Sequence, residues 1–402
     1  MPVNKGKKKK TAFVITGGYA IGGAETRFVN AFKYLHASNQ DFEYFLILSG
    51  KKYVSLIKHN ILNSSDEGVI VNSPCFLIRL FKFTFDKKVK SKNLTNNRNR
   101  IIKRLTKWLS LFFNVGFIVF VILKKRINIL HPITEGTPPT GIVKILMPRI
   151  KLVSSFLTLV PSWHKKGLWY LHSSQVLSLK NSDIIDVLGQ SYLQTLEKIN
   201  INYNPKKIHI SECSFILPFK IEEKKENIVV FSGRLDQQKN PVLFVEAAKI
   251  VLASYTENVR FIILGSGPQK STIENLINKY QINDNFSLEY SLKQTEILSK
   301  SIIFCSLQDK DNYPGQSLLQ AMYAGNGIIA TNVGETDKLI QHNISGFLTK
   351  PDPKKIAEYI CYYLKNKEMR KQMGMAASTF VMNHHNIELF SKYLSSLYKK
   401  VI

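Results

Sequence analysis

The stretch IVVFSGRLDQQKNPVLFVEAAKIV, residues 228–251, decides the fold. It begins with a short apolar run at 228–232, passes through a polar turn that contains Gly233, and continues from Pro241 as a helix-like segment. Short apolar runs bounded by turn residues are typical of buried strands, whereas longer periodic segments are typical of helices. This order of strand, polar loop and helix predicts an α/β unit.

The same alternation continues on both sides of this stretch. Downstream, expected strands lie at 259–264, 286–290, 302–306 and 327–331, and expected helices at 241–254, 270–280, 293–299 and 315–323. Upstream, a strand at 12–16 ends in two glycines and precedes a helix at 25–35, with further strands at 44–48, 127–130 and 151–156. Strands that alternate with helices predict parallel sheets covered by helices on both faces.

The chain is long enough for two such units. Its 402 residues, 44% of them hydrophobic, exceed what one core usually supports. We expect an amino-terminal domain at 1–210, a carboxyl-terminal domain at 211–385 and a last helical segment at 386–402. The Lys- and Glu-rich segment 219–227 is the expected linker.

In doubly wound sheets ligands bind at the carboxyl ends of the strands, so the loops that follow strands are the places to search. After the strand at 228–232, Gly233 is followed by Arg234 and Lys239 at a turn into a helix. A guanidinium, an ammonium and a helix amino terminus together suit a pyrophosphate. Two solvated surface cations are the alternative interpretation.

Two further loops have suitable chemistry. Gly265-Ser266-Gly267-Pro268 follows the strand at 259–264, and its glycines would let the backbone approach a nucleotide, although a plain turn explains them equally well. The segment 309–322, DKDNYPGQSLLQAM, leads into a helix whose first turn has free N–H groups for phosphate or sugar hydroxyls.

Four motifs in order carry a resemblance to a known family: GRLDQQKN, FIILGSGP, NYPGQSLLQAMYAGNGIIATNVGETDKLI and SGFLTKPD. They resemble the carboxyl-terminal domain of the family-4 retaining glycosyltransferases over residues 226–365. The glycine loop Gly22-Gly23-Ala24-Glu25 is similar to the amino-terminal loop of that family, and the resemblance is faint at 50–210. It implies the GT-B fold, in which two Rossmann-like doubly wound domains face each other across a cleft.

The resemblance also implies an activity and a set of site residues. The activity is transfer of a hexosyl unit, with retention, from a nucleoside-diphosphate sugar to a glycan or lipid-linked saccharide, in the synthesis of a cell-surface polysaccharide. Arg234 and Lys239 would neutralise the departing diphosphate. The other implied donor-binding residues are Gly23, Gly233, Gly265, Asn312, Gly315, Gln316, Ser317, Leu318 and Gln320. No cofactor and no metal is expected, because the sugar nucleotide is a substrate.

The chain departs from the family at two positions. The family usually has two glutamates separated by seven residues, where this chain has Asn312 and Gln320. A glutamate at the second position accepts both ribose hydroxyl protons, whereas Gln320 has one acceptor oxygen and an NH₂ group. The amides leave open a second interpretation, a non-catalytic GT-B-like partner that binds sugar or a membrane.

Three other features are considered beside these motifs. His131, after an expected strand, and Glu25, in the glycine loop, are possible pocket residues, with a structural histidine as the alternative for His131. Asp309-Lys310-Asp311 has the DxD pattern of metal-binding glycosyltransferases of another fold, and we interpret it as chance.

Positive charge is concentrated in the first half of the chain. Residues 1–210 contain 33 Lys and Arg against 10 Asp and Glu, a net +23 of the chain's +27. Residues 79–126 alone contain 14 cations and one acid, interleaved with aromatic side chains. This pattern favours binding to an anionic membrane surface. A nucleic acid is less favoured because the sequence contains no nucleic-acid-binding motif. The alternative without a partner is a solvated face over a buried helix.

The compartment follows from the cysteines and from the apolar runs. The four cysteines are far apart and form no CxxC pair, which is typical of a reducing compartment. The apolar run 108–123 is short for a spanning helix and is expected to be buried or interfacial. We therefore expect a cytoplasmic protein that is peripheral on the cytoplasmic face of the membrane.

Overall fold

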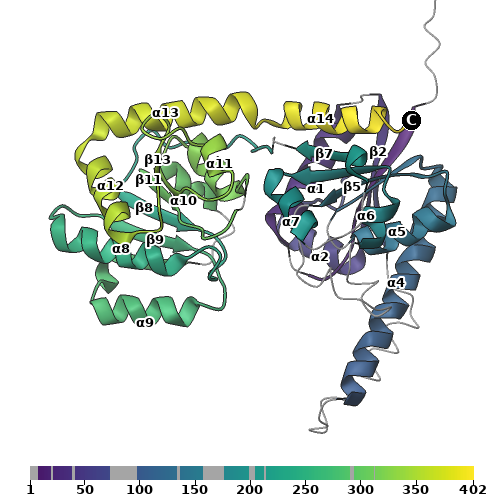
Figure 1. Cartoon of the computed structure of the whole chain (residues 1–402), viewed down its shortest axis with the longest axis horizontal. Helices are drawn as coiled ribbons and strands as arrows, with labels where there is room; N and C mark the ends of the chain where they lie inside the picture. The colour runs from purple at the N-terminus through teal and green to yellow at the C-terminus, as the bar shows by residue number, and fades with distance from the viewer. Residues whose placement is uncertain are drawn as a thin grey trace, which may run out of the picture. The chain divides into compact units, whose positions relative to one another are not determined.

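The computed structural model divides into two compact units, residues 1–211 with 391–402, and residues 212–390. It describes residues 8–19, 21–38, 41–72, 97–133, 136–156, 176–198, 204–211, 214–289, 294–311 and 313–402, and only the backbone at 97–107 and 195–198. Each unit contains one parallel sheet with helices on its faces (Figure 1).

The carboxyl-terminal unit is built on a six-stranded parallel sheet in the order β10-β9-β8-β11-β12-β13. Its strands are β8 (Ile228–Ser232), β9 (Arg260–Leu264), β10 (Phe286–Glu289), β11 (Ile303–Ser306), β12 (Gly327–Thr331) and β13 (Phe347–Thr349). Its helices are α8 (Pro241–Ser254), α9 (Lys270–Tyr280), α10 (Gln294–Lys300), α11 (Gln316–Tyr323), α12 (Pro353–Lys365) and α13 (Lys367–His384). Short 3-10 turns lie at η5 (Asn283–Asn285) and η6 (Thr336–Lys338).

This unit has two hydrophobic cores, one on each face of the sheet, and successive residues of the strand β8 point alternately into one and the other. Val229 and Phe231 of β8 point into a core with α8, α9 and α12, while Ile228 and Val230 point into a core with α10, α11 and α13. Because the sheet is buried on both faces, its strands are almost continuously apolar.

The amino-terminal unit has a seven-stranded parallel sheet in the order β3-β2-β1-β4-β5-β6-β7. The strands are β1 (Lys9–Ile15), β2 (Phe42–Ser49), β3 (Val69–Asn72), β4 (Ile129–Pro132), β5 (Lys151–Phe156), β6 (Ile184–Leu188) and β7 (Ile208–Ser211). The helices are α1 (Gly23–Ala37), α2 (Gly50–Lys58), α4 (Asn97–Lys125), α5 (Thr137–Leu146), α6 (Val176–Asn181) and α7 (Gln190–Lys198), and a 3-10 turn η4 (Pro205–Lys207) precedes β7.

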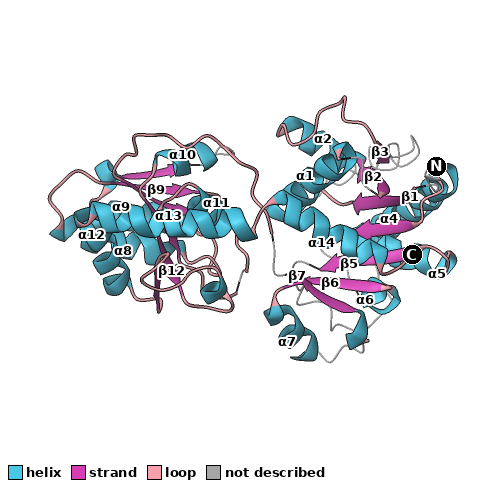
Figure 2. Ribbon diagram, turned by 90° about the horizontal axis from the view of Figure 1, so that it is seen from above, coloured by secondary structure: helices cyan, strands magenta, loops and turns pink. Residues whose placement is uncertain are grey.

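Both faces of this sheet are also covered. Ala12 and Val14 of β1 point into a core with α4 and α5, whereas Phe13 between them contacts Phe28 of α1 and Tyr398. Tyr398 belongs to α14 (Ile387–Lys399), the last helix, which lies across the strands of this sheet (Figure 2). The segment expected at 386–402 is thus a helix whose residues from 391 onward pack with the amino-terminal unit.

The prediction of an interdomain linker at 219–227 is wrong. The boundary between the units falls at 211/212, and the expected linker belongs to the carboxyl-terminal unit. The polar composition of this segment does not indicate a linker, because Lys225 bonds to residues of the same unit. Its Nζ donates to the carbonyl of Ala324 at the end of α11 and to Asn326. Phe219 contributes a ring contact with Tyr323.

Candidate functional site

A hollow lies at the carboxyl ends of β8 and β11 in the carboxyl-terminal unit, where a doubly wound sheet binds ligands. Residues from both strands, from the loops after them and from the first turn of α11 line it. They are Phe231, Ser232, Gly233, Lys239, Phe304, Cys305, Ser306, Leu307, Gln308, Gly315, Gln316, Ser317 and Leu318. None of these described residues is acidic, so the hollow suits an anion.

Lys239 is the cation of this hollow. Its Nζ donates a hydrogen bond of 3.2 Å to Oε1 of Gln308, and its backbone N–H donates to Asp236. Burial lowers the pKa of Lys239 to about 8, because the ammonium is removed from water. The side-chain partner of this partly desolvated ammonium is a neutral amide. A phosphate that binds beside it would therefore form a strong, charge-assisted hydrogen bond with it.

Arg234 is placed differently from the expectation that pairs it with Lys239. Its side chain is 70% exposed and bonds the carboxylate of Asp236 two residues along the chain. It does not line the hollow. To reach a ligand there, the guanidinium would have to exchange Asp236 for a phosphate, which costs little at an exposed position.

The first turn of α11 supplies backbone donors to the same hollow. Gly315 is the residue before the helix, and the N–H groups of Gln316, Ser317 and Leu318 have no partner within the helix because they belong to its first turn. The helix dipole adds positive potential there. The side chain of Gln316 donates to the carbonyl of Phe215, so this residue offers the hollow its backbone N–H.

Gly265 acts on the site through the backbone. A Cβ at this position would lie 1.9 Å from the carbonyl oxygen of Gly233, so only glycine lets the two loops approach so closely. The N–H of Gly233 donates to Leu264, and that of Leu235 donates to Ser266. Gly265 therefore shapes the loop that contains Gly233 and does not itself line the hollow.

Gln320 is held by a residue that the sequence analysis missed. The amide of Gln294, at the start of α10, donates to Oε1 of Gln320, and Oε1 of Gln294 accepts from the hydroxyl of Ser232 at 2.8 Å. One of the two lone pairs on the acceptor oxygen of Gln320 is thus engaged, whereas a glutamate would have a second oxygen at this position. No local pattern singles out Gln294, because the contact joins residues 26 apart.

Asp309 and Asp311, in the loop after β11, accept hydrogen bonds from other residues of this unit. Oδ1 of Asp309 accepts from Asn240 at 2.8 Å, and Oδ1 of Asp311 accepts the N–H groups of Tyr313 and Glu335. Across the described ranges no group of three or more metal-ligating side chains occurs, and these two carboxylates serve the loops. Asn312 lies outside the described residues.

In the amino-terminal unit, the glycine loop begins α1. Gly23 is the first residue of the helix, and Glu25 in its first turn accepts the N–H of Gly22 at 2.9 Å. The other carboxylate oxygen of Glu25 pairs with Lys52 of α2 at 3.3 Å, and both side chains are largely buried. The carboxylate of Glu25 thus caps α1 and pairs with Lys52, and its role as a pocket residue stays a prediction.

His131 lies near the carboxyl end of β4, as expected, but not in an open pocket. Its ring is fully buried. Nε2 lies 2.7 Å from the hydroxyl oxygen of Ser155, and Nδ1 lies 2.7 Å from the hydroxyl oxygen of Tyr398. Ser155 donates to Asp186, so His131 donates to Ser155 through Nε2 and accepts from Tyr398. Burial lowers the pKa of His131 to about 3, and the positive charge of Arg27 makes a smaller contribution in the same direction. Full burial and two hydrogen-bond partners favour the alternative of a structural histidine.

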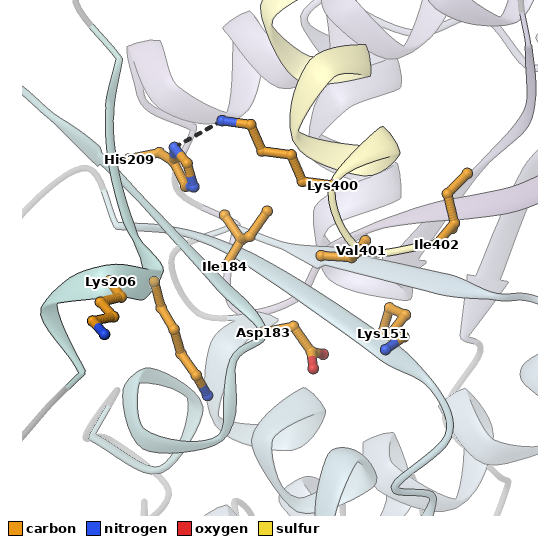
Figure 3. A pocket seen from close by; sticks show the side chains of 9 residues that line it. Lys151, Asp183, Ile184, Lys206, His209, Lys400, Val401 and Ile402 are labelled. Carbon is orange, nitrogen blue, oxygen red and sulfur yellow. Dashed lines mark hydrogen bonds between the residues drawn. The ribbon is translucent and has the colours of Figure 1, made fainter.

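A second hollow, of about 500 Å³, lies in the amino-terminal unit (Figure 3). It opens where β5, β6 and β7 begin, at the sheet edge opposite the carboxyl ends of these strands. Lys400 contacts His209 there at 3.3 Å and helps to lower the pKa of that imidazole, after burial. Its lining residues are Lys151, Asp183, Ile184, Lys206, Lys207, His209, Lys400, Val401 and Ile402. Within its own unit, it lies at the sheet edge opposite the glycine loop 22–25, which follows the carboxyl end of β1.

Comparisons with known proteins agree with the motifs. Residues 215–380 match the family model described as glycosyl transferases group 1. A 2-deoxystreptamine N-acetyl-D-glucosaminyltransferase of Niallia circulans is 27% identical over 58% of this chain and 59% of its own length. An α-1,4-N-acetyl-D-galactosaminyltransferase of Campylobacter jejuni, which is named for a PP-undecaprenol-linked saccharide, is 28% identical over 48% of this chain and 53% of its own length. The chain thus spans between about half and three fifths of these relatives.

A solved structure extends the likeness of the fold over both units. HepE of Anabaena, in complex with UDP and glucose, superposes with a TM-score of 0.69 at 13% identity, covering 98% of this chain and all of that chain. The fold is GT-B, as the resemblance implied, and the family resemblance itself is confirmed over the carboxyl-terminal unit.

Proposed function

We propose that this chain, whose residues 215–380 match the group 1 glycosyl transferases, is a retaining glycosyltransferase that takes a hexosyl unit from a nucleoside-diphosphate sugar. One observation carries the proposal. The half-buried Lys239 and the amino-terminal turn of α11 line one hollow that has no acidic side chain among its described residues. Such a site binds a diphosphate through charge and backbone N–H groups together.

The proposed chemistry uses the diphosphate as both leaving group and base. The bond between the anomeric carbon and the phosphate oxygen breaks, and the acceptor oxygen forms a bond to that carbon on the same face. The acceptor proton passes to an oxygen of the departing phosphate. Lys239 stabilises the charge that develops on this phosphate, with Arg234 as a second cation once it leaves Asp236.

The proposed acceptor is a glycan or a lipid-linked saccharide in cell-surface polysaccharide synthesis. The support is the net charge of +23 in residues 1–210, together with the Campylobacter jejuni relative, whose name includes a PP-undecaprenol-linked saccharide. The same charge supports a location at the cytoplasmic face of a membrane, where the cations meet anionic lipid. No metal or other cofactor takes part in the proposed reaction.

The experiment that tests this function is donor hydrolysis and transfer with a panel of nucleotide sugars. Nucleoside diphosphate should be released by the wild-type chain and lost in Lys239→Ala, while the exposed-lysine control Lys270→Ala keeps its activity. A chain that binds a nucleotide sugar and never releases the diphosphate with any acceptor would instead be the non-catalytic GT-B-like partner. This second function is retained because Gln320 has a single acceptor oxygen, and that oxygen already accepts a hydrogen bond from Gln294.

A further inference from the structure

The helix α4 is apolar on two opposite faces. At 100° per residue, one side of the helix carries the buried residues Leu111, Val115, Ile118, Val121 and Ile122. The last four of these belong to the core with β1, β2 and β4. On the opposite side, within an arc of about 80°, lie Leu109, Phe112, Gly116, Phe120 and Leu123. The four large side chains of this second set are between 52% and 65% exposed.

The neighbouring helix also carries exposed apolar residues. Helix α5 packs beside α4 in the same core, and at its end Ile145 and Leu146 are 53% and 62% exposed. We call the six exposed residues, Leu109, Phe112, Phe120, Leu123, Ile145 and Leu146, the α4–α5 apolar face. Figure 1 shows α4 as a long helix whose amino-terminal half extends beyond the other described elements of its unit. Large exposed apolar side chains on two neighbouring helices are typical of an interaction surface.

Cations flank the apolar face. Lys124, Lys125 and Arg126 at the end of α4 are exposed, and Nζ of Lys124 lies 5.5 Å from the ring centroid of Phe120. In the sequence, the first turns of α4, residues 97–107, contain five Lys or Arg and no acid. Cations beside aromatic and aliphatic side chains match the phosphates and the acyl boundary of an anionic bilayer.

The packing of the inner face of α4 argues against a helix that crosses the bilayer. By length and composition Trp108–Lys125 is apolar enough to span one, with a mean hydropathy of 1.7, but its inner face packs on the sheet. Leaving the sheet would expose the strands that it covers. Only the outer face is available, and only 28% of this window is buried within the protein.

We propose that the α4–α5 apolar face inserts into one leaflet of an anionic membrane, with α4 lying in the plane of the interface and its flanking cations at the lipid phosphates. This goes beyond a basic protein resting on a charged surface, because it assigns the contact to named apolar side chains. The proposed membrane contact is independent of the glycosyl-transfer chemistry. No residue that lines the hollow at the carboxyl ends of β8 and β11, which we call the donor hollow, belongs to the α4–α5 apolar face.

Flotation of the full chain with lipid vesicles tests the proposal. The probes are phosphatidylcholine vesicles with and without phosphatidylglycerol. Phe112→Ser/Phe120→Ser should reduce partitioning to anionic vesicles by at least roughly tenfold, since two aromatic side chains lose their burial. The matched control, Ile344→Ser/Met375→Ser, removes two equally exposed apolar residues from the carboxyl-terminal unit and should leave partitioning unchanged.

Gly116 allows a second pair of variants that does not disturb the fold. A Cβ there meets nothing within 4 Å, and most residues favour a helix more than glycine does. Gly116→Leu should strengthen partitioning by roughly tenfold, and Gly116→Glu should weaken it. Purely electrostatic adsorption would leave Gly116→Leu at the wild-type value.

Three results would overturn the proposal. They are an absence of binding to anionic vesicles, wild-type partitioning of Phe112→Ser/Phe120→Ser, and no response to Gly116→Leu. The first, combined with a lipid-free dimer in sedimentation velocity that Phe112→Ser/Phe120→Ser dissociates, would assign the face to a second copy of the chain. None of these results depends on whether the protein transfers sugar.

Discussion

Replacing Lys239 by methionine removes the ammonium from the donor hollow and keeps most of the side-chain volume. Because the ammonium would form a charge-assisted hydrogen bond to a diphosphate, we expect UDP binding to weaken by about 1.5 to 3 kcal/mol, or roughly 10- to 150-fold in Kd. The measurement is isothermal titration calorimetry with UDP, together with kcat/KM for diphosphate release. The control Lys270→Met removes an exposed ammonium that pairs with Glu274 at 3.7 Å, and it should change neither value.

The stability of the variant distinguishes a lost ligand contact from misfolding. Burial lowers the pKa of Lys239 from 10.5 to about 8, so the folded protein holds this proton less tightly than the unfolded chain does. The contribution of Lys239 to stability therefore rises as the pH increases from about 8 to 10.5. Below pH 8 the partly desolvated ammonium is unfavourable for folding, so Lys239→Met should not lower Tm at pH 7.

The affinity for UDP should also depend on pH in a way that the variant lacks. Only the protonated lysine attracts a diphosphate, so wild-type affinity should be greatest below about pH 8 and should fall as the pH rises through that value. Lys239→Met should show no such decrease in this range. Wild-type Kd for UDP in Lys239→Met at pH 7, with normal folding, would refute the reasoning.

Three further variants test other parts of the structure. Gln320→Glu should tighten UDP binding by about 1 to 3 kcal/mol in calorimetry, because Gln294 can hold one carboxylate oxygen while the other accepts a ribose hydroxyl; unchanged or weaker binding would contradict this. Gly265→Ala should lower Tm and UDP affinity together, since its Cβ would overlap the carbonyl of Gly233, and a normal Tm would show that the loops can separate. His131→Phe should destabilise by about 2 to 4 kcal/mol in urea denaturation and leave the KM for the donor unchanged; a raised KM would return His131 to the pocket.

Local pattern was sufficient for the elements that follow one another closely in the carboxyl-terminal unit. The strands at 228–232 and 327–331 and the helices at 241–254 and 270–280 have the expected bounds. Their apolar periods are uninterrupted, and their ends carry clear signals, such as Pro241 after the left-handed Asn240.

Elements whose apolar pattern is short or broken were not predicted. Strand β6 carries Asp186 at a buried position, and β13 has three residues, so neither shows a strand-like run. Asp186 is tolerated because Ser155 donates to it from the neighbouring strand and Tyr393 donates from α14. Burial raises the pKa of this carboxyl. Such partners are distant in sequence, and local patterns do not contain them.

The candidate site shows the same limit. Lys239 and the Gly315–Leu318 turn follow from loop position and helix geometry, and the structure brings them to one hollow. The burial of His131 by Tyr398 depends on a contact between residues 267 apart, and the hold of Gln294 on Gln320 depends on the packing of α10 against α11. The expected partners of Asn312 stay a prediction, because it lies outside the described residues.

A structure of the protein bound to UDP tests the central assignment most directly. We expect the diphosphate within hydrogen-bonding distance of Nζ of Lys239 and of the N–H groups at 316–318. UDP bound instead among Lys206, Lys207 and Lys400 in the amino-terminal hollow, with the carboxyl-terminal hollow empty, would contradict the assignment.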